Sequence, residues 1–139
     1  MKKTLGLDLG DKWIGVAISD SSGKYSFPLK TIEKKDLPAF LKEITRSESI
    51  SNIIYGLPIT LKGEIGSQAK KTNELVIFLE KSLCNPDISF ISVDERFSSS
   101  SAQKIARQNC SVKNKNEHSI AAALLLEVFL KQQELRQES

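Results

Sequence analysis

The chain has 139 residues, of which 40% are hydrophobic and 27% charged, with a formal net charge of +3. These values predict one soluble globular domain over residues 1–139, and the small positive charge is only weak support for an anionic partner. No apolar run approaches the roughly 20 residues that cross a bilayer, and no signal-peptide pattern follows the first residues. Cys84 and Cys110 lack metal-ligand spacing, so we expect reduced thiols and a cytoplasmic protein away from membranes.

The first part of the chain predicts an antiparallel meander of three strands. Alternating or apolar runs place these strands at residues 4–9, 13–19 and 25–32. The run Asp20-Ser21-Ser22-Gly23-Lys24 is a strong turn signal between the second strand and the third, and we expect Asp20 to stabilise that turn. Pro28 places the third strand at an edge of the sheet, because proline cannot donate a ladder hydrogen bond.

Helices and strands alternate in the rest of the chain. Residues 37–47 have helical spacing, with Asp36 as the expected N-cap and Pro38 in the first turn. The apolar run 52–57 predicts a strand that is buried on both faces. The later elements are a helix at 67–83, a strand at 88–93, a helix at 98–108 and a helix at 117–134 whose end frays from Gln132.

The first two strands each carry one bulky face and one face of small residues. Gly6, Asp8 and Gly10 share a face of the first strand, while Gly15 and Ala17 share a face of the second. Small residues allow another element to approach the sheet closely, and the run Ala121-Ala122-Ala123 suits the last helix to do so. We therefore expect this helix to cross the small-residue face and to bring its N-terminal end near Asp8.

Acidic residues occur at two strands of the predicted sheet. Asp8 lies within an apolar strand, where a carboxylate must be paired or must bind a metal. Asp94 and Glu95 follow the apolar run 88–93 and could supply the second carboxylate. Carboxylates brought together at strand ends hold Mg²⁺ or Mn²⁺ against phosphates, so the pattern indicates metal-dependent phosphoryl transfer or nuclease chemistry.

Four blocks of the sequence, in order and at matching spacing, resemble the YqgF/RuvX family. They are Leu5-Gly6-Leu7-Asp8-Leu9-Gly10 with Ile14-Gly15-Val16-Ala17, then Gly56-Leu57-Pro58 with Gly63, Gly66 and Gln68, then Asp94-Glu95-Arg96-Phe97-Ser98-Ser99, and the alanine run with Leu124 and Leu125. Proteins of this family are described as Holliday junction resolvases and as pre-16S ribosomal RNA nucleases. The resemblance implies an α/β, ribonuclease H-like fold with a mixed five-stranded sheet, three strands antiparallel and then two parallel, flanked by helices.

The chain departs from the family pattern at two positions. The family usually has a basic residue at the position of Trp13, and an aspartate three residues before the alanine run, at the position of His118. Spacing puts His118 in the first turn of the last helix, with Asn116 as N-cap, on the face that carries Ala121 and Ala122. A helix N-terminus disfavours imidazolium, and neutral imidazole suits Mn²⁺ better than Mg²⁺.

These observations give a candidate metal and catalytic set of Asp8, Glu95 and His118, with Mg²⁺ or Mn²⁺ as cofactor. The resemblance favours Glu95 over Asp94, whereas the residues alone leave that choice open. Two alternatives to His118 also remain open: a ligand from Glu117 after a small helix rotation, or a site that has lost its activity.

Nucleic acid is the expected partner, and we predict that six residues contact it. Arg96 could bind a phosphate bidentately or pair with an adjacent carboxylate, and the serines after it could cap a helix or donate to phosphate. Lysines before the last helix would contact the backbone without reading sequence. The predicted contacts are Lys12, Arg96, Ser98, Ser99, Lys113 and Lys115.

The favoured function is therefore a metal-dependent endonuclease of structured nucleic acid, acting at the 5′ end of pre-16S rRNA, on Holliday junctions, or on both. A monomer or a weak homodimer is expected. The alternative is an RNA-binding ribosome-maturation factor with little or no catalysis, suggested by Trp13 and His118. An ATP-dependent kinase or ATPase is disfavoured, because the chain is too short for two lobes.

Overall fold

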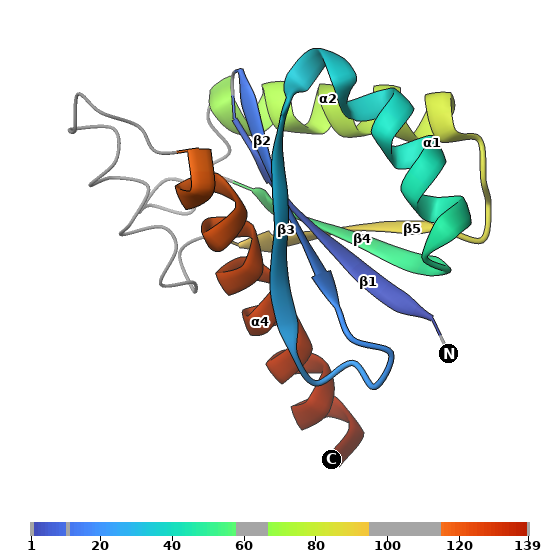
Figure 1. Ribbon diagram of the computed structural model, residues 1–139, viewed down its shortest axis with the longest axis vertical. Helices are drawn as coiled ribbons and strands as arrows, with labels where there is room; N and C mark the ends of the chain where they lie inside the picture. The colour runs from blue at the N-terminus through green and yellow to red at the C-terminus, as the bar shows by residue number, and fades with distance from the viewer. Residues whose placement is uncertain (1, 11, 58–66, 95–114, 139) are drawn as a thin grey trace.

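The computed structural model describes residues 2–10, 12–57, 67–94 and 115–138 (Figure 1). The strands are β1 (Lys3–Leu9), β2 (Trp13–Ser19), β3 (Ser26–Glu33), β4 (Ile50–Leu57) and β5 (Ser89–Asp94). The helices are the short 3₁₀ turn η1 (Lys34–Asp36) and the α-helices α1 (Leu37–Ser47), α2 (Ser67–Leu83) and α4 (Lys115–Glu138). The helix expected at residues 98–108 lies outside the described part of the chain.

The strands form one mixed sheet in the order β3-β2-β1-β4-β5. β1 pairs antiparallel with β2, and β2 antiparallel with β3. β4 pairs parallel with β1 and with β5. The predicted sheet of three antiparallel and two parallel strands is confirmed, and β3, with Pro28, occupies the predicted edge. The register between β2 and β3 shifts at Val16/Ala17, next to the proline.

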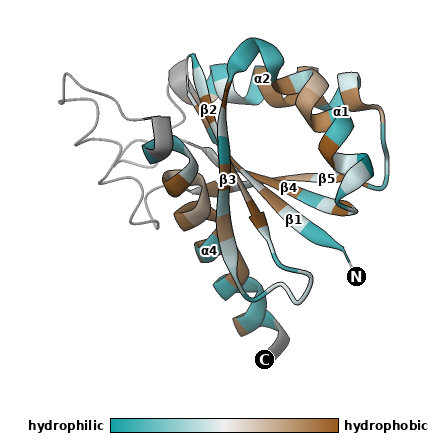
Figure 2. Ribbon diagram, in the orientation of Figure 1, coloured by the Kyte–Doolittle hydropathy of each residue, from teal (hydrophilic) through white to brown (hydrophobic). Residues whose placement is uncertain are grey.

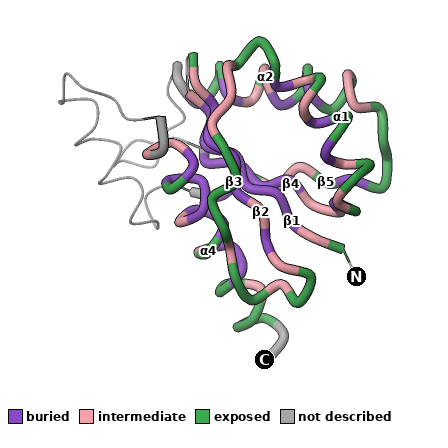
Figure 3. Tube along the Cα trace, viewed as in Figure 1, coloured by how far each residue is buried: buried purple, intermediate pink, exposed green. Residues whose placement is uncertain are grey.

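Helices cover both faces of the sheet (Figure 1). One buried cluster joins Leu5, Leu7, Ile14 and Val16 to α1 and α2, and a second joins Ala17, Ile54 and Val93 to α4. Figure 2 shows the apolar segments along the strands, and Figure 3 shows the central strands and the inner side of α4 buried while β3 is largely exposed. Among the described helices, none is both long enough and apolar enough to span a bilayer.

Two glycines allow α4 to lie directly on the sheet. A Cβ atom added to Gly15 would overlap the backbone carbonyl oxygen of His118, and one added to Gly6 would lie 3.2 Å from the carbonyl oxygen of Ala122. The prediction that the last helix crosses the small-residue face, with its N-terminal end near Asp8, is confirmed.

The element boundaries differ from expectation in three places. α4 begins at Lys115, so Asn116 lies inside the helix and is not its N-cap. The same helix continues past Gln132 to Glu138, through residues that are mostly good helix formers. Asp36 makes no side-chain cap, because it ends η1 in a helical backbone conformation.

Candidate active site

The candidate site lies at the edge of the sheet that is formed by the carboxyl ends of its parallel strands. β1, β4 and β5 are parallel and end at this edge, where β2 begins and β3 ends. Open α/β sheets bind ligands at the carboxyl ends of their parallel strands. Asp8 is the last residue but one of β1, and it pairs with Gly15 of β2.

Asp8 is a buried carboxylate with its side chain on the α4 side of the sheet. The residue is only 3% exposed, although it lies between two buried leucines. Its neighbours Leu7 and Leu9 belong to the cluster on the opposite face, and this alternation turns Asp8 towards α4. A charge so placed requires compensation from the groups around it.

The first turn of α4 provides part of that compensation. Nδ1 of His118 lies 3.7 Å from Oδ2 of Asp8, and the two side chains are 16% and 4% exposed. The distance is too long for a hydrogen bond, and the contact is an ion pair only when the imidazole carries a proton. The positive end of the α4 dipole lies beside the same carboxylate and favours its charged form.

Glu117 adds a second buried carboxylate oxygen at this end of α4. Its Oε2 atom is inaccessible to solvent and has no hydrogen-bond partner among the residues that the structure describes. Because buried acceptors in folded proteins are nearly always satisfied, such an atom indicates a place for water or a cation. Glu117 was expected only as an alternative ligand, since an acidic residue in a first helical turn is ordinarily solvated and interacts favourably with the helix dipole.

The other predicted site residues are only partly covered by the structure. Lys12 is exposed, with Nζ 5.6 Å from the centre of the Trp13 ring. Lys115 is the first residue of α4. The remaining predicted residues, Glu95, Arg96, Ser98, Ser99 and Lys113, lie outside the described part of the chain. Within that part, histidines, cysteines and carboxylates nowhere gather in a group of three that could hold a metal.

Asp20 stabilises its turn, as expected. Its carboxylate accepts a hydrogen bond from the Ser22 hydroxyl and bonds of 3.0 and 3.1 Å from the backbone N–H groups of Lys24 and Tyr25. The Ser22 hydroxyl, followed by these backbone donors, holds the pKa of Asp20 below its ordinary value of 3.8. Asp20 directly follows the last residue of β2. Because β2 runs antiparallel to β1, Asp20 lies at the opposite end of the strands from Asp8.

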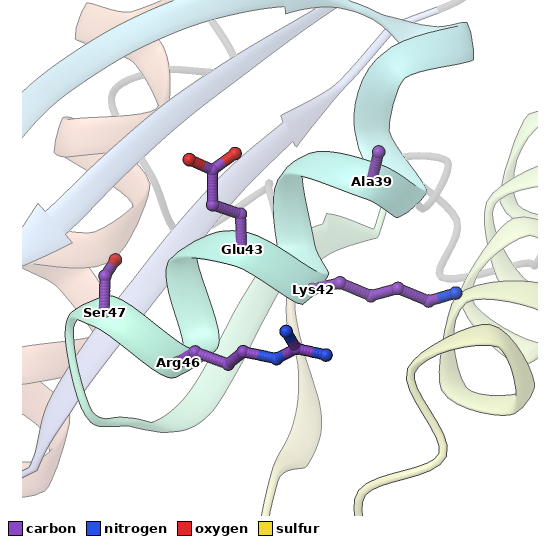
Figure 4. Close-up of a pocket in the computed structure, with 5 residues that line it drawn as sticks. All are labelled: Ala39, Lys42, Glu43, Arg46 and Ser47. Carbon is purple, nitrogen blue, oxygen red and sulfur yellow. The ribbon is translucent and has the colours of Figure 1, made fainter.

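A shallow pocket elsewhere on the surface is not part of this site. It lies along α1, where Lys42 and Arg46 extend to one side of the helix and Glu43 and Ser47 to another (Figure 4). All four side chains are exposed, and the pocket has none of the buried polar groups found beside Asp8. We therefore place the candidate site at the edge of the sheet where β1 meets α4.

Comparison with known proteins agrees with this geometry. The sequence profile of RuvX, described as "Holliday junction resolvase", matches residues 2–132. The chain belongs to the RuvX family. Membership confirms the resemblance inferred from the four sequence blocks, and it makes the protein a member of a nuclease family.

Two relatives and one solved structure give the extent of the similarity. Proteins named "Putative pre-16S rRNA nuclease" are 44% identical in Sulfurihydrogenibium sp., over 94% of this chain and 90% of the relative, and 36% identical in Fusobacterium nucleatum, over 94% and 97%. Thermus thermophilus RuvC in complex with a Holliday junction substrate has a TM-score of 0.57 at 10% identity, over 96% of each chain. That likeness confirms the ribonuclease H-like fold.

Proposed function

We propose that this RuvX-family chain is a divalent-metal-dependent endonuclease of structured nucleic acid, built as one domain over residues 1–139. Its substrate would be the 5′ end of pre-16S rRNA, a Holliday junction, or both, as the names of its relatives suggest. The observation that carries the proposal is the buried Asp8 carboxylate beside His118 at the ligand-binding edge of the sheet. We further propose a cytoplasmic protein that is a monomer or a weak homodimer.

Asp8, Glu95 and His118 would hold the metal. The donor chemistry fits, because carboxylate and imidazole bind Mg²⁺ or Mn²⁺, and the unpartnered Glu117 oxygen is a further buried acceptor nearby in the sequence. Once bound, the ion would activate water and neutralise charge on the phosphate. Asp8 would fix its position, because its strand is paired on both sides and cannot easily shift.

The choice of Glu95 over Asp94 is supported by the faces of β5. Ile91 and Val93 pack with the cluster under α4, so odd-numbered residues of this strand face the same side as Asp8. This parity favours Glu95 as the second carboxylate of the proposed set.

Glu117 is the alternative to His118 as the third ligand. His118 is favoured by its Nδ1 atom, which lies 3.7 Å from the Asp8 carboxylate. The buried oxygen of Glu117 would reach a cation if α4 rotated slightly on the small-residue face. Replacing each side chain separately distinguishes the two ligands.

Nucleic acid would approach along the same edge. Lys12, Arg96, Ser98, Ser99, Lys113 and Lys115 are the proposed contacts to its sugar–phosphate backbone. Such contacts position a substrate without reading its sequence, so selectivity would come from the shape of a junction or a precursor end.

A second candidate function is RNA binding in ribosome maturation with little or no cleavage. His118 in the position where the family resemblance predicts an aspartate favours it, because the change removes one negative charge from the proposed metal set. The two candidates share the nucleic-acid surface and differ only in catalysis.

The deciding experiment compares cleavage of a pre-16S rRNA 5′ leader and of a four-way DNA junction, each with Mg²⁺ and with Mn²⁺. Asp8→Asn should abolish cleavage while folding and binding persist. Asp20→Asn is the matched control, because this carboxylate lies at the opposite end of the sheet from Asp8, and it should cleave like wild type. If Asp8→Asn retains activity within a few-fold of wild type, the proposal that Asp8 binds the catalytic metal is refuted. Binding by wild type without cleavage would favour the RNA-binding factor.

A further inference from the structure

Trp13 lies beside Asp8 on the same face of the sheet. It is the first residue of β2, two positions before Gly15, and Gly15 is the direct partner of Asp8. Side chains two positions apart in a strand share a face, so Trp13 is a diagonal cross-strand neighbour of Asp8 at about 7–8 Å. The large aromatic ring therefore borders the candidate active site.

This ring is not a core residue. Trp13 is half-buried, and among the described residues it belongs to neither hydrophobic cluster. It is the first residue of β2, at the end of the sheet where Asp8 lies, and part of its side chain reaches solvent. A partly exposed aromatic ring at the rim of a site offers a face on which a flat ligand can stack.

Three lysines surround the Trp13 end of the sheet. Lys12 is adjacent in sequence, with Nζ 5.6 Å from the ring centre. The backbone N–H of Lys34 donates to the carbonyl oxygen of Lys12 at 2.8 Å, which ties η1 to the turn before β2. Lys34 and Lys35 are both exposed, and Glu33, the cross-strand partner of Trp13, pairs with Lys35 at 3.4 Å.

We propose that Trp13 is a stacking platform for an unpaired nucleobase next to the cleaved phosphodiester, with Lys12, Lys34 and Lys35 on the neighbouring phosphates. The substrate class rests on the proposed function. An aromatic ring flanked by cations is how proteins hold single-stranded nucleic acid, because every base offers a π-face and every linkage a phosphate. A base within a duplex is already stacked on its neighbours, so the platform selects an unpaired nucleotide.

The Lys12 contact is compatible with this role. A cation over an exposed ring is weakly held, and an incoming base stacks more strongly than the ammonium group binds. The displaced ammonium group remains within reach of the phosphate attached to that base. Trp13 would thereby give the site a preference for single-stranded nucleic acid. The other predicted contacts are to the sugar–phosphate backbone and do not provide this preference.

The chain provides its own probe, because Trp13 is its single tryptophan. Wild-type fluorescence is titrated, in EDTA, with an RNA hairpin bearing a single-stranded 5′ overhang and with the same hairpin made blunt. The overhang should quench the tryptophan and the blunt hairpin should not. An overhang lacking bases at successive positions should identify the nucleotide that stacks.

Variants separate stacking from charge and from structure, with affinity measured by anisotropy of a labelled RNA. Trp13→Ala should weaken binding of the overhang by roughly five-fold to a hundred-fold and leave the blunt hairpin within two-fold. Trp13→Phe should retain most of the affinity, whereas Trp13→Lys should not. Phe27→Ala is the matched control, because Phe27 is an exposed aromatic at the other end of β3.

Three results would overturn the inference. The first is binding of the overhang with unchanged tryptophan fluorescence, and the second is an equal loss of overhang and blunt binding in Trp13→Ala. The third is absence of binding to either RNA. Because the titration contains no metal, quenching without any cleavage would mean that the nuclease proposal had failed and the stacking site had not. Cleavage by wild type without quenching would mean that the stacking proposal had failed and the nuclease proposal had not.

Discussion

Gly15→Ala is a direct test of how α4 is seated against β2. The added Cβ would overlap the His118 carbonyl oxygen and would lie 2.8 Å from the Ser119 backbone nitrogen, where ordinary contact begins at 3.4 Å. Relieving the Ser119 contact alone requires a shift of about 0.6 Å, and the overlap with the His118 carbonyl requires a larger one. Both colliding groups are backbone atoms, so no side chain can rotate to relieve the overlap.

The expected cost of Gly15→Ala follows from overpacking. Forced backbone shifts destabilise proteins by about 1–3 kcal/mol, and the lower chain entropy of alanine offsets less than 1 kcal/mol of this. We expect a net loss of about 2 kcal/mol, which corresponds to a Tm lower by roughly 7 °C for a chain of this size. Cleavage measured well below that Tm should also fall, because His118 moves relative to Asp8.

Two further glycines calibrate the measurement. At Gly6 the added Cβ would meet Leu126 Cβ at 3.1 Å and the Ala122 carbonyl oxygen at 3.2 Å, a tight contact that small adjustments relieve. Gly6→Ala should therefore change Tm by less than about 3 °C. At Gly23 nothing lies within 4 Å, but φ is +74°, so Gly23→Ala should lower stability by backbone strain and leave cleavage intact. If Gly15→Ala has the same Tm as Gly6→Ala and cleaves like wild type, the close packing of α4 on Gly15 is refuted.

Three other predictions concern metal choice, nucleic-acid binding and pH. With His118 as a ligand, wild type should cleave better with Mn²⁺ than with Mg²⁺, and His118→Asp should raise Mg²⁺-supported cleavage; if His118→Asp and His118→Ala both match wild type with both metals, His118 is no ligand. Changing Lys113 and Lys115 together to alanine should weaken binding equally across sequences and flatten the log K against log salt slope by roughly two units, and an unchanged slope would place the binding surface elsewhere. The lowered pKa of Asp20 contributes stability above its unfolded-state pKa of about 4 that is lost as pH falls through the lower folded-state value, so Asp20→Asn should melt below wild type at neutral pH and converge with it in acid; a Tm difference that is constant with pH would contradict this.

The strand pattern and the position of the last helix could be predicted because they depend on local chemistry. Alternation of large and small residues around Gly6 and Gly15 identified the face that receives α4, and Pro28 identified the edge strand. Asp8 was recognisable because a carboxylate within an apolar strand has few structural explanations.

Other features depend on contacts that no local pattern encodes. α4 includes Asn116, which capping preference would place just before the helix. The 3₁₀ turn before α1 is fixed by the backbone bond between Lys34 and Lys12, and these residues are distant in sequence. The unpartnered oxygen of Glu117 depends on solvent exclusion in three dimensions, so the sequence could offer Glu117 only as an alternative ligand.

The crossing of α4 over β1 and β2 also bears on how the protein matures. Asp8 and His118 lie 110 residues apart along the chain, so the two groups meet only after almost every other described element has been synthesised. Until then, Ala17, Ile54 and Val93 remain uncovered on one face of the sheet. A nascent or truncated chain that ends before α4 would therefore expose an aggregation-prone apolar surface and would lack His118 beside Asp8. The protein would complete its candidate active site and bury this surface in the same late step of folding.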